Sequence, residues 1–205
     1  MRLNTIAWAA LAASGLAAGK IQMTVINNLR EVAQAADKFY DGITAFNGNP
    51  LEAASLFRST ASIRSLLDRA SNSIERETLL LNSRDVAEED FGIFLDSLSA
   101  GAPMVKGKVA VSEEDIEETG FQLANQIVDT FERIVDAVIS KKRIIDAIPI
   151  IGRRVVRSVL DGLEPSALRL AEATASVASE ERQGDAEENV KRIKAAFDKV
   201  DAAFQ

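Results

Sequence analysis

Apolar residues recur along most of this chain at alternating spacings of three and four, which is the period of one face of an α-helix. The widest such face lies between Val111 and Ile148, where two apolar rows run side by side. A two-helix seam needs only one row, so two rows predict a helix packed between several neighbours or beside an apolar cavity. The first row holds Phe121, Ala124, Val128, Phe131, Val135 and Val138, and the second holds Leu123, Ile127, Ile134 and Ala137.

Four further segments repeat this period, which gives five amphipathic helices in all. Pro165 falls inside the fourth and predicts a kink, while Asp185 is expected to cap the fifth. Short connections between amphipathic helices predict an all-α fold, an antiparallel bundle with either a filled core or an apolar cavity. The predicted helices cover residues 22–46, 51 to about 81, 111–148, a stretch beginning after Gly152 and a stretch beginning after Gly184.

Two features interrupt this regular pattern. Glu77 falls on the inner stripe of the second helix, and because Glu is rarely buried we expect the stripe to drift and this side chain to reach solvent. The segment 84–111 has a short helical pattern and then a break at Ser99–Pro103, so we expect a connector there, with a lid over a cavity as the alternative.

Charged residues four apart, Asp129 with Arg133 and Glu188 with Arg192, are expected to pair along their own helices.

The first nineteen residues have the pattern of a secretory signal. A positive start at Arg2 precedes an apolar run over 6–18, and Ala17 and Gly19 are small residues suited to a cut before Lys20. An N-terminal core helix is the alternative. We therefore expect residues 1–19 to be a signal peptide and residues 20–205 one secreted, extracellular domain without a transmembrane anchor.

Composition narrows the chemistry further. The chain has 24 basic and 31 acidic residues, a net charge of −7, which argues against nucleic acid as a partner. It has no His and no Cys, which excludes Ser-His-Asp and Cys-His catalysis and the usual zinc sites. The acidic runs fall at predicted helix starts, where acids stabilise the helix dipole. We therefore expect a protein that is not an enzyme, with no catalytic residue, metal site or cofactor.

Three segments resemble the fungal hydrophobic surface-binding protein A family, which includes the cell wall galactomannoproteins. They are Val25–Leu29, which opens a helix ending at Phe46-Asn47-Gly48, the run Ile134–Lys142, and Val155–Leu163 after the following turn. The resemblance covers about residues 22–205 and consists mainly of apolar spacing. Segment 84–111 departs from it as an apparent insertion, and the Ser/Thr-rich tail of wall-bound members is missing.

The resemblance implies a secreted, non-catalytic helical bundle that adsorbs to hydrophobic surfaces or encloses a fatty acid, loosely associated with the cell wall. Some members assist surface-acting hydrolases, so a secreted hydrolase is a further expected partner. Lys141 and Lys142 are candidates to hold a lipid head group, with compensation of the helix-end charge as the alternative. Candidate cavity walls come from three helices and are Phe39, Ile43, Leu123, Ile127, Phe131, Ile134, Val138, Val159 and Leu163.

Two other functions stay open. A secreted, effector-like module with a filled core would bind a partner protein through its exposed faces. An enzyme using only carboxylates is conceivable, but no pair of acids is specified by the sequence. The volume of the interior distinguishes the protein-binding module from a lipid binder, because a lipid site needs roughly 300–1,000 Å³.

Overall fold

The computed structural model describes residues 15–85, 113–148 and 152–205, and the described residues are helical apart from short turns. This confirms the predicted all-α bundle. Five helices are long and one, α6, is a single short turn of helix between α5 and α7. Their bounds are α2 Gly15–Ala45, α3 Pro50–Asp85, α5 Glu113–Ser140, α6 Lys142–Asp146, α7 Gly152–Val177 and α8 Gln183–Phe204.

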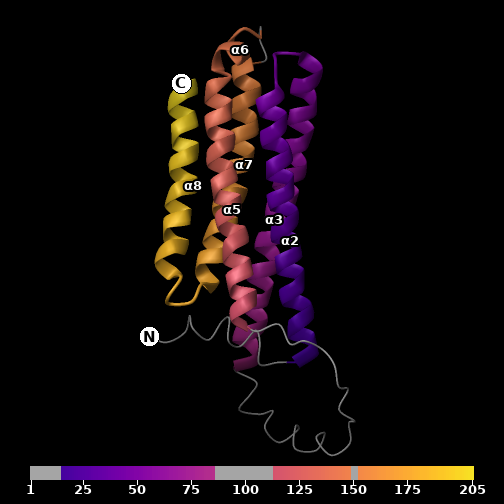
Figure 1. Ribbon diagram of the computed structural model, residues 1–205, viewed down its shortest axis with the longest axis vertical. Coiled ribbons are helices and arrows are strands. Elements are labelled where there is room, and N and C mark those ends of the chain that lie inside the picture. The colour runs from indigo at the N-terminus through magenta and orange to yellow at the C-terminus, as the bar shows by residue number, and fades with distance from the viewer. Residues whose placement is uncertain (1–14, 86–112, 149–151) are drawn as a thin grey trace, which may run out of the picture.

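The long helices form a closed ring in cross-section. Going round it, α2 packs against α5, α5 against α8, α8 against α7, α7 against α3, and α3 against α2. In Figure 1, α8 stands at one side of the bundle, α2 and α3 stand at the other, and α5 and α7 lie between them. Contacts straight across from α5 to α7 are few, so α8 covers the space between those two helices.

The apolar stripes predicted from the sequence form the interior of this ring. Val32, Ala36, Leu67 and Leu163 are completely buried, and both rows of α5 contribute to the core. Seven apolar residues recur at spacings of three and four along residues 25–46, and all seven are buried, because a face of period 3.6 can contact two neighbouring helices at once. The buried members of that stripe are Val25, Leu29, Val32, Ala36, Phe39, Ile43 and Phe46.

The prediction of one helix over 111–148 was wrong at its C-terminal end. α5 ends at Ser140, and α6 begins at Lys142 after a turn at Lys141. The Ser140 hydroxyl donates to the Ala137 carbonyl at 2.7 Å, and the Lys141 ammonium donates to the Phe46 carbonyl at 3.0 Å. These two bonds satisfy carbonyls at the ends of α5 and α2, so the chain turns where the sequence pattern alone would continue.

The fifth helix also begins earlier than predicted. The Ala186 amide donates to the Arg182 carbonyl at 2.9 Å, so the N-cap is Arg182 and Asp185 lies in the first turn. Its carboxylate still faces the positive end of the helix dipole, which explains an acid there without a capping bond. Pro165 lies inside α7, which continues unbroken from Gly152 to Val177.

Two helices have an end that differs from the boundary predicted from the sequence. α2 begins at Gly15, ahead of the expected cut before Lys20, and α3 continues to Asp85 rather than ending near Leu81. The signal peptide stays a prediction, since residues 1–14 lie outside the described part of the chain. The expected connector or lid over 84–111 lies outside it almost entirely. None of the described helices combines the length and apolarity needed to cross a membrane.

Candidate functional site

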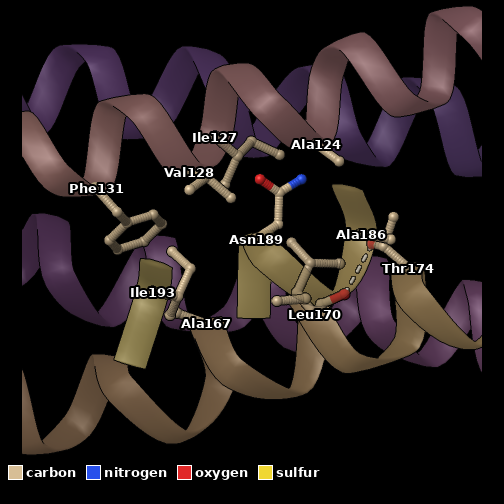
Figure 2. A pocket seen from close by; sticks show the side chains of 11 residues that line it. Ala124, Ile127, Val128, Phe131, Ala167, Leu170, Thr174, Ala186, Asn189 and Ile193 are labelled. Atoms are coloured by element: carbon tan, nitrogen blue, oxygen red, sulfur yellow. Dashed lines mark hydrogen bonds between the residues drawn. The ribbon is translucent and has the colours of Figure 1, made fainter. Parts of the chain in front are cut away.

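A small cavity lies between α5, α7 and α8, on the side of the ring that α8 covers. Its volume is about 20 Å³, which is enough for one water molecule and far below the volume of a lipid site. Figure 2 shows Phe131, Ala167 and Ile193 at one end of it and Ala124, Thr174 and Ala186 at the other. The lining residues are Ala124, Ile127, Val128, Phe131, Ala167, Leu170, Ala171, Thr174, Ala186, Asn189 and Ile193.

Side-chain size explains why the cavity is there. Four of its lining residues are alanines, Ala124 on α5, Ala167 and Ala171 on α7, and Ala186 on α8. Larger side chains close its end nearer α6, where the rings of Phe131 and Phe197 lie 6.1 Å apart between centroids. Interiors normally pack to high density, so a gap walled by small residues marks a place where these three helices pack less tightly.

Asn189 brings a polar group into this apolar surrounding. It is 7% exposed, and its Nδ2 donates to Oδ1 of Asn125 on α5 at 2.6 Å. Its own Oδ1 accepts from Arg192 at 3.5 Å. In Figure 2 the amide points towards α5 between Ile127 and Ala124. The other polar lining residue, Thr174, donates its hydroxyl to the Leu170 carbonyl at 2.8 Å, so both groups are satisfied within the protein.

The edge between α5 and α8 is joined by a row of ion pairs. Arg182 pairs with Glu118, Arg192 pairs with Glu132 and Asp129, and Lys199 pairs with Asp136. Arg192 does not pair with Glu188, nor Asp129 with Arg133, so those two predictions of pairing within a helix were wrong. Arg133 instead lies 4.0 Å from Asp37 and its guanidinium lies over the Tyr40 ring. These ion pairs therefore join neighbouring helices rather than residues of the same helix.

The opposite edge of α8, against α7, has a different character. Among the described residues no ion pair joins α7 to α8. Glu164 on α7 faces Asp198 and Asp201 on α8, and its pKa is raised by burial and by these neighbouring carboxylates, with Lys194 acting in the opposite direction. This edge is therefore held by apolar packing against like-charge repulsion.

Glu77 is buried in the finished fold, so the prediction that it reaches solvent was wrong. The residue is 7% exposed, and its Oε1 has no hydrogen-bond partner. Burial raises the pKa of its carboxyl to about 7. The stripe Ile63, Leu67, Ala70 and Ile74 stays buried along α3, which packs against α2 on one side and α7 on the other.

The nine candidate cavity residues lie in several places. Ile127 and Phe131 line the cavity. Leu123 and Val159 are partly buried and pack against the core. The sequence analysis assigned no residue of the fifth helix to the cavity, although Ala186, Asn189 and Ile193 on α8 complete its wall. The position of Asn189 within the apolar stripe of that helix was the one signal in the sequence that could have indicated this. The remaining candidates, Phe39, Ile43, Ile134, Val138 and Leu163, are buried in the main core away from the cavity lining.

The two head-group candidates lie at the end of the bundle near α6. Lys141 donates to the Phe46 carbonyl. The Lys142 ammonium lies 3.5 Å from the Asp146 carboxylate and 4.8 Å from the centroid of the Phe204 ring. Each ammonium group therefore has a partner within the protein, and the Phe131–Phe197 contact separates both from the cavity.

Comparison with known proteins identifies the fold. No protein-family model matches the chain, and no curated protein matches its sequence. A crystal structure of AFMP4P in complex with palmitic acid matches with a TM-score of 0.66 and 16% identity, over 90% of this chain and 99% of that one. At this identity the likeness shows a shared fold, a helical bundle that in AFMP4P accompanies a bound fatty acid.

Proposed function

We propose that this protein is a non-catalytic binder of long-chain fatty acids or related lipids, secreted into the extracellular space or the cell wall. The observation that carries the proposal is the alanine-walled cavity in the ring of helices, in a chain that shares its fold with a palmitic acid complex. Buried methylene groups would supply the affinity, at about 0.8 kcal/mol each. Twelve of them contribute on the order of 10 kcal/mol against the cost of association.

The cavity has to enlarge to hold such a ligand. A lipid site needs roughly 300–1,000 Å³, whereas about 20 Å³ is open here. We propose that the bundle opens at the edge between α7 and α8, where no ion pair joins the described residues and where Asp198 and Asp201 repel Glu164 while Lys194 attracts it. The ion pairs from α8 to α5 would stay intact during this movement.

A lipid extract and a titration test the proposal. Protein purified from the medium of expressing cells is extracted and analysed by mass spectrometry, and lipid-stripped protein is titrated with a fluorescent fatty acid that palmitic acid displaces. We expect saturable binding. N-terminal sequencing of the same secreted material tests the cut before Lys20. Absence of bound lipid together with absence of saturable binding would overturn the proposal.

A matched pair of variants places the ligand. Ala171→Leu adds bulk at the cavity wall, while Ala195→Leu adds the same bulk on the exposed face of α8. We expect the first to weaken fatty-acid binding about tenfold or more, since overfilling a packed site typically costs about 1–3 kcal/mol. The second should bind as the wild type does. Equal affinities for both variants would exclude this cavity as the site.

A protein-interaction module is the second candidate, and the closely packed interior is the observation that favours it. Leu51, Phe57 and Leu79 on α3 are exposed and would be available to a partner protein. Assisting a secreted hydrolase would also be a function of this kind, because it requires contact with another protein. A wild-type protein that binds no lipid but raises the activity of a hydrolase on an insoluble substrate would favour this candidate.

A further inference from the structure

We propose that Asn189 selects lipids that carry a hydroxyl group along the hydrocarbon chain, so that the cavity binds a hydroxylated fatty acid more tightly than the unsubstituted one. This inference rests on the proposed function and names the ligand class of the same cavity. Ligand sites are mostly apolar, and the few polar groups in their walls decide specificity. Among the eleven residues that line this cavity, only Asn189 and Thr174 are polar.

The amide of Asn189 has hydrogen-bonding capacity to spare. Each of its two polar atoms has one partner in the described part of the chain, whereas an amide can make up to four hydrogen bonds. Nδ2 carries two hydrogens and donates one of them to Asn125 at 2.6 Å. Oδ1 accepts from Arg192 over a long 3.5 Å. A hydroxyl group matches the remaining capacity, because it both donates and accepts.

The position of Asn189 suits a group in the middle of a chain. The residue is 7% exposed, and it lies on α8 between Ala186 and Ile193, which are at opposite ends of the cavity. Along the helix axis it lies about 5 Å from Ala186 and about 6 Å from Ile193. Figure 2 shows the amide among the apolar lining residues. A chain lying along the cavity would therefore pass Asn189 with carbon atoms on both sides.

The charges beside Asn189 favour an uncharged oxygen over an ionised head group. The Arg192 guanidinium that contacts Asn189 also binds Glu132 and Asp129. One positive and two negative groups leave this cluster negative. A carboxylate placed at Asn189 would be repelled by that charge, and its burial would cost more than the burial of a neutral group. A hydroxyl group can bind the amide without either cost.

Displacement of a fluorescent fatty acid tests the proposal with four competing ligands. They are octadecanoate, its 10-hydroxy and 12-hydroxy forms, and its 2-hydroxy form, whose hydroxyl lies beside the head group and serves as the control. For the wild type we expect at least one of the two mid-chain hydroxy acids to bind about fivefold more tightly than octadecanoate, the usual effect of one hydrogen bond. The 2-hydroxy form should bind as octadecanoate does.

Two variants show whether Asn189 is the cause of this preference. Asn189→Leu should bind octadecanoate at least as tightly as the mid-chain hydroxy acids, because a buried hydroxyl would then lack a partner. Thr174→Val is the matched control and should keep the wild-type preference, since the Thr174 hydroxyl already donates to the Leu170 carbonyl at 2.8 Å. If Asn189 only packs α8 against α5, Asn189→Leu will weaken all four ligands alike and leave their ratios unchanged.

The outcomes separate this inference from the proposed function. If the wild type prefers neither mid-chain hydroxy acid, or if folded Asn189→Leu keeps the preference, the inference is wrong while the proposed function stands. Far-ultraviolet circular dichroism shows whether that variant is folded, and the ratio in the wild type tests the inference without it. If none of the four ligands displaces the probe from the wild type, the proposed function itself is wrong.

Discussion

Arg192 on α8 binds both carboxylate oxygens of Glu132 on α5, with Nε at 3.0 Å and Nη2 at 2.6 Å. The same Nη2 also donates to Asp129 at 2.6 Å, and these bonds raise the pKa of the guanidinium. Two parallel bonds between a guanidinium and a carboxylate fix direction as well as distance. This pair therefore sets how α8 lies against α5 beside the cavity.

Replacing Arg192 should loosen that edge. We expect Arg192→Met to lower the free energy of unfolding by about 1 kcal/mol, a value kept small because the pair is partly exposed to solvent. Urea unfolding followed by circular dichroism measures it. The control is Lys191→Met, whose exposed contact with Glu188 at 3.7 Å should contribute almost nothing. If the two variants lose equal stability, the pair does not hold the edge.

Glu77 should make stability depend on pH. Its carboxyl has a pKa of about 7 in the folded protein against a model value of 4.5. Between those values the folded state holds a proton that the unfolded state has lost, so its contribution to stability is present below pH 4.5 and declines as pH rises to 7. Glu77→Gln removes this decline. We expect the variant to gain about 3 kcal/mol over the wild type on going from pH 4.5 to pH 8.

Comparing the two proteins at each pH isolates this residue, since the other carboxyl groups titrate in both. Urea unfolding at pH 4.5 and pH 8 gives the difference. A gap between variant and wild type that is the same at both values would show that the buried carboxyl titrates normally.

The side chain of Lys141 should stabilise the contact between the end of α2 and the start of α6. Its ammonium donates to the Phe46 carbonyl at 3.0 Å. Lys141→Met should cost about 1 kcal/mol, the usual worth of a partly buried hydrogen bond, and leave dodecanoate affinity unchanged. Thermal unfolding and a binding titration check both parts. A large loss of affinity with intact stability would instead support the head-group role expected from the sequence.

Gly48 should be hard to replace. Its φ is +97°, a conformation that L side chains rarely adopt, and an added Cβ would lie 3.0 Å from Cγ2 of Ile144. We expect Gly48→Ala to destabilise by about 1–2 kcal/mol. The matched control is Gly184→Ala, where nothing lies within 4 Å of the added Cβ and the helical backbone suits alanine, so a gain of about 0.5–1 kcal/mol is expected. Differential scanning calorimetry distinguishes opposite signs from a shared loss.

The helices and their buried faces could be predicted because each depends on local spacing. Val32 and Leu163 are completely buried where the period places them. Glu77 could not be assigned correctly, since its burial depends on how α2 and α7 cover α3, and general preference argued for solvent. The end of α5 was missed for a similar reason: the bond from Lys141 to Phe46 joins residues far apart in the sequence.

The candidate site was less accessible to sequence reasoning. A cavity forms where the surfaces of neighbouring helices do not fit together closely, and the spacing of residues along one helix does not reveal such a place. Ala167 and Ala186 resemble ordinary core alanines until α7 and α8 are placed side by side. Arg192 has Glu188 at pairing distance along its own helix, yet its partners lie on α5. Charge pairing on an amphipathic helix thus depends on which helix comes next to it.

The two edges of α8 will respond differently to ionic strength. Dissolved salt screens the attraction of Arg192 and Lys199 for α5, and it equally screens the repulsion of Glu164 by Asp198 and Asp201. Salts that strengthen apolar contacts act further in favour of the α7 edge. Dilute buffer therefore holds α8 on α5 and loosens it from α7, whereas concentrated salt shifts the balance towards α7.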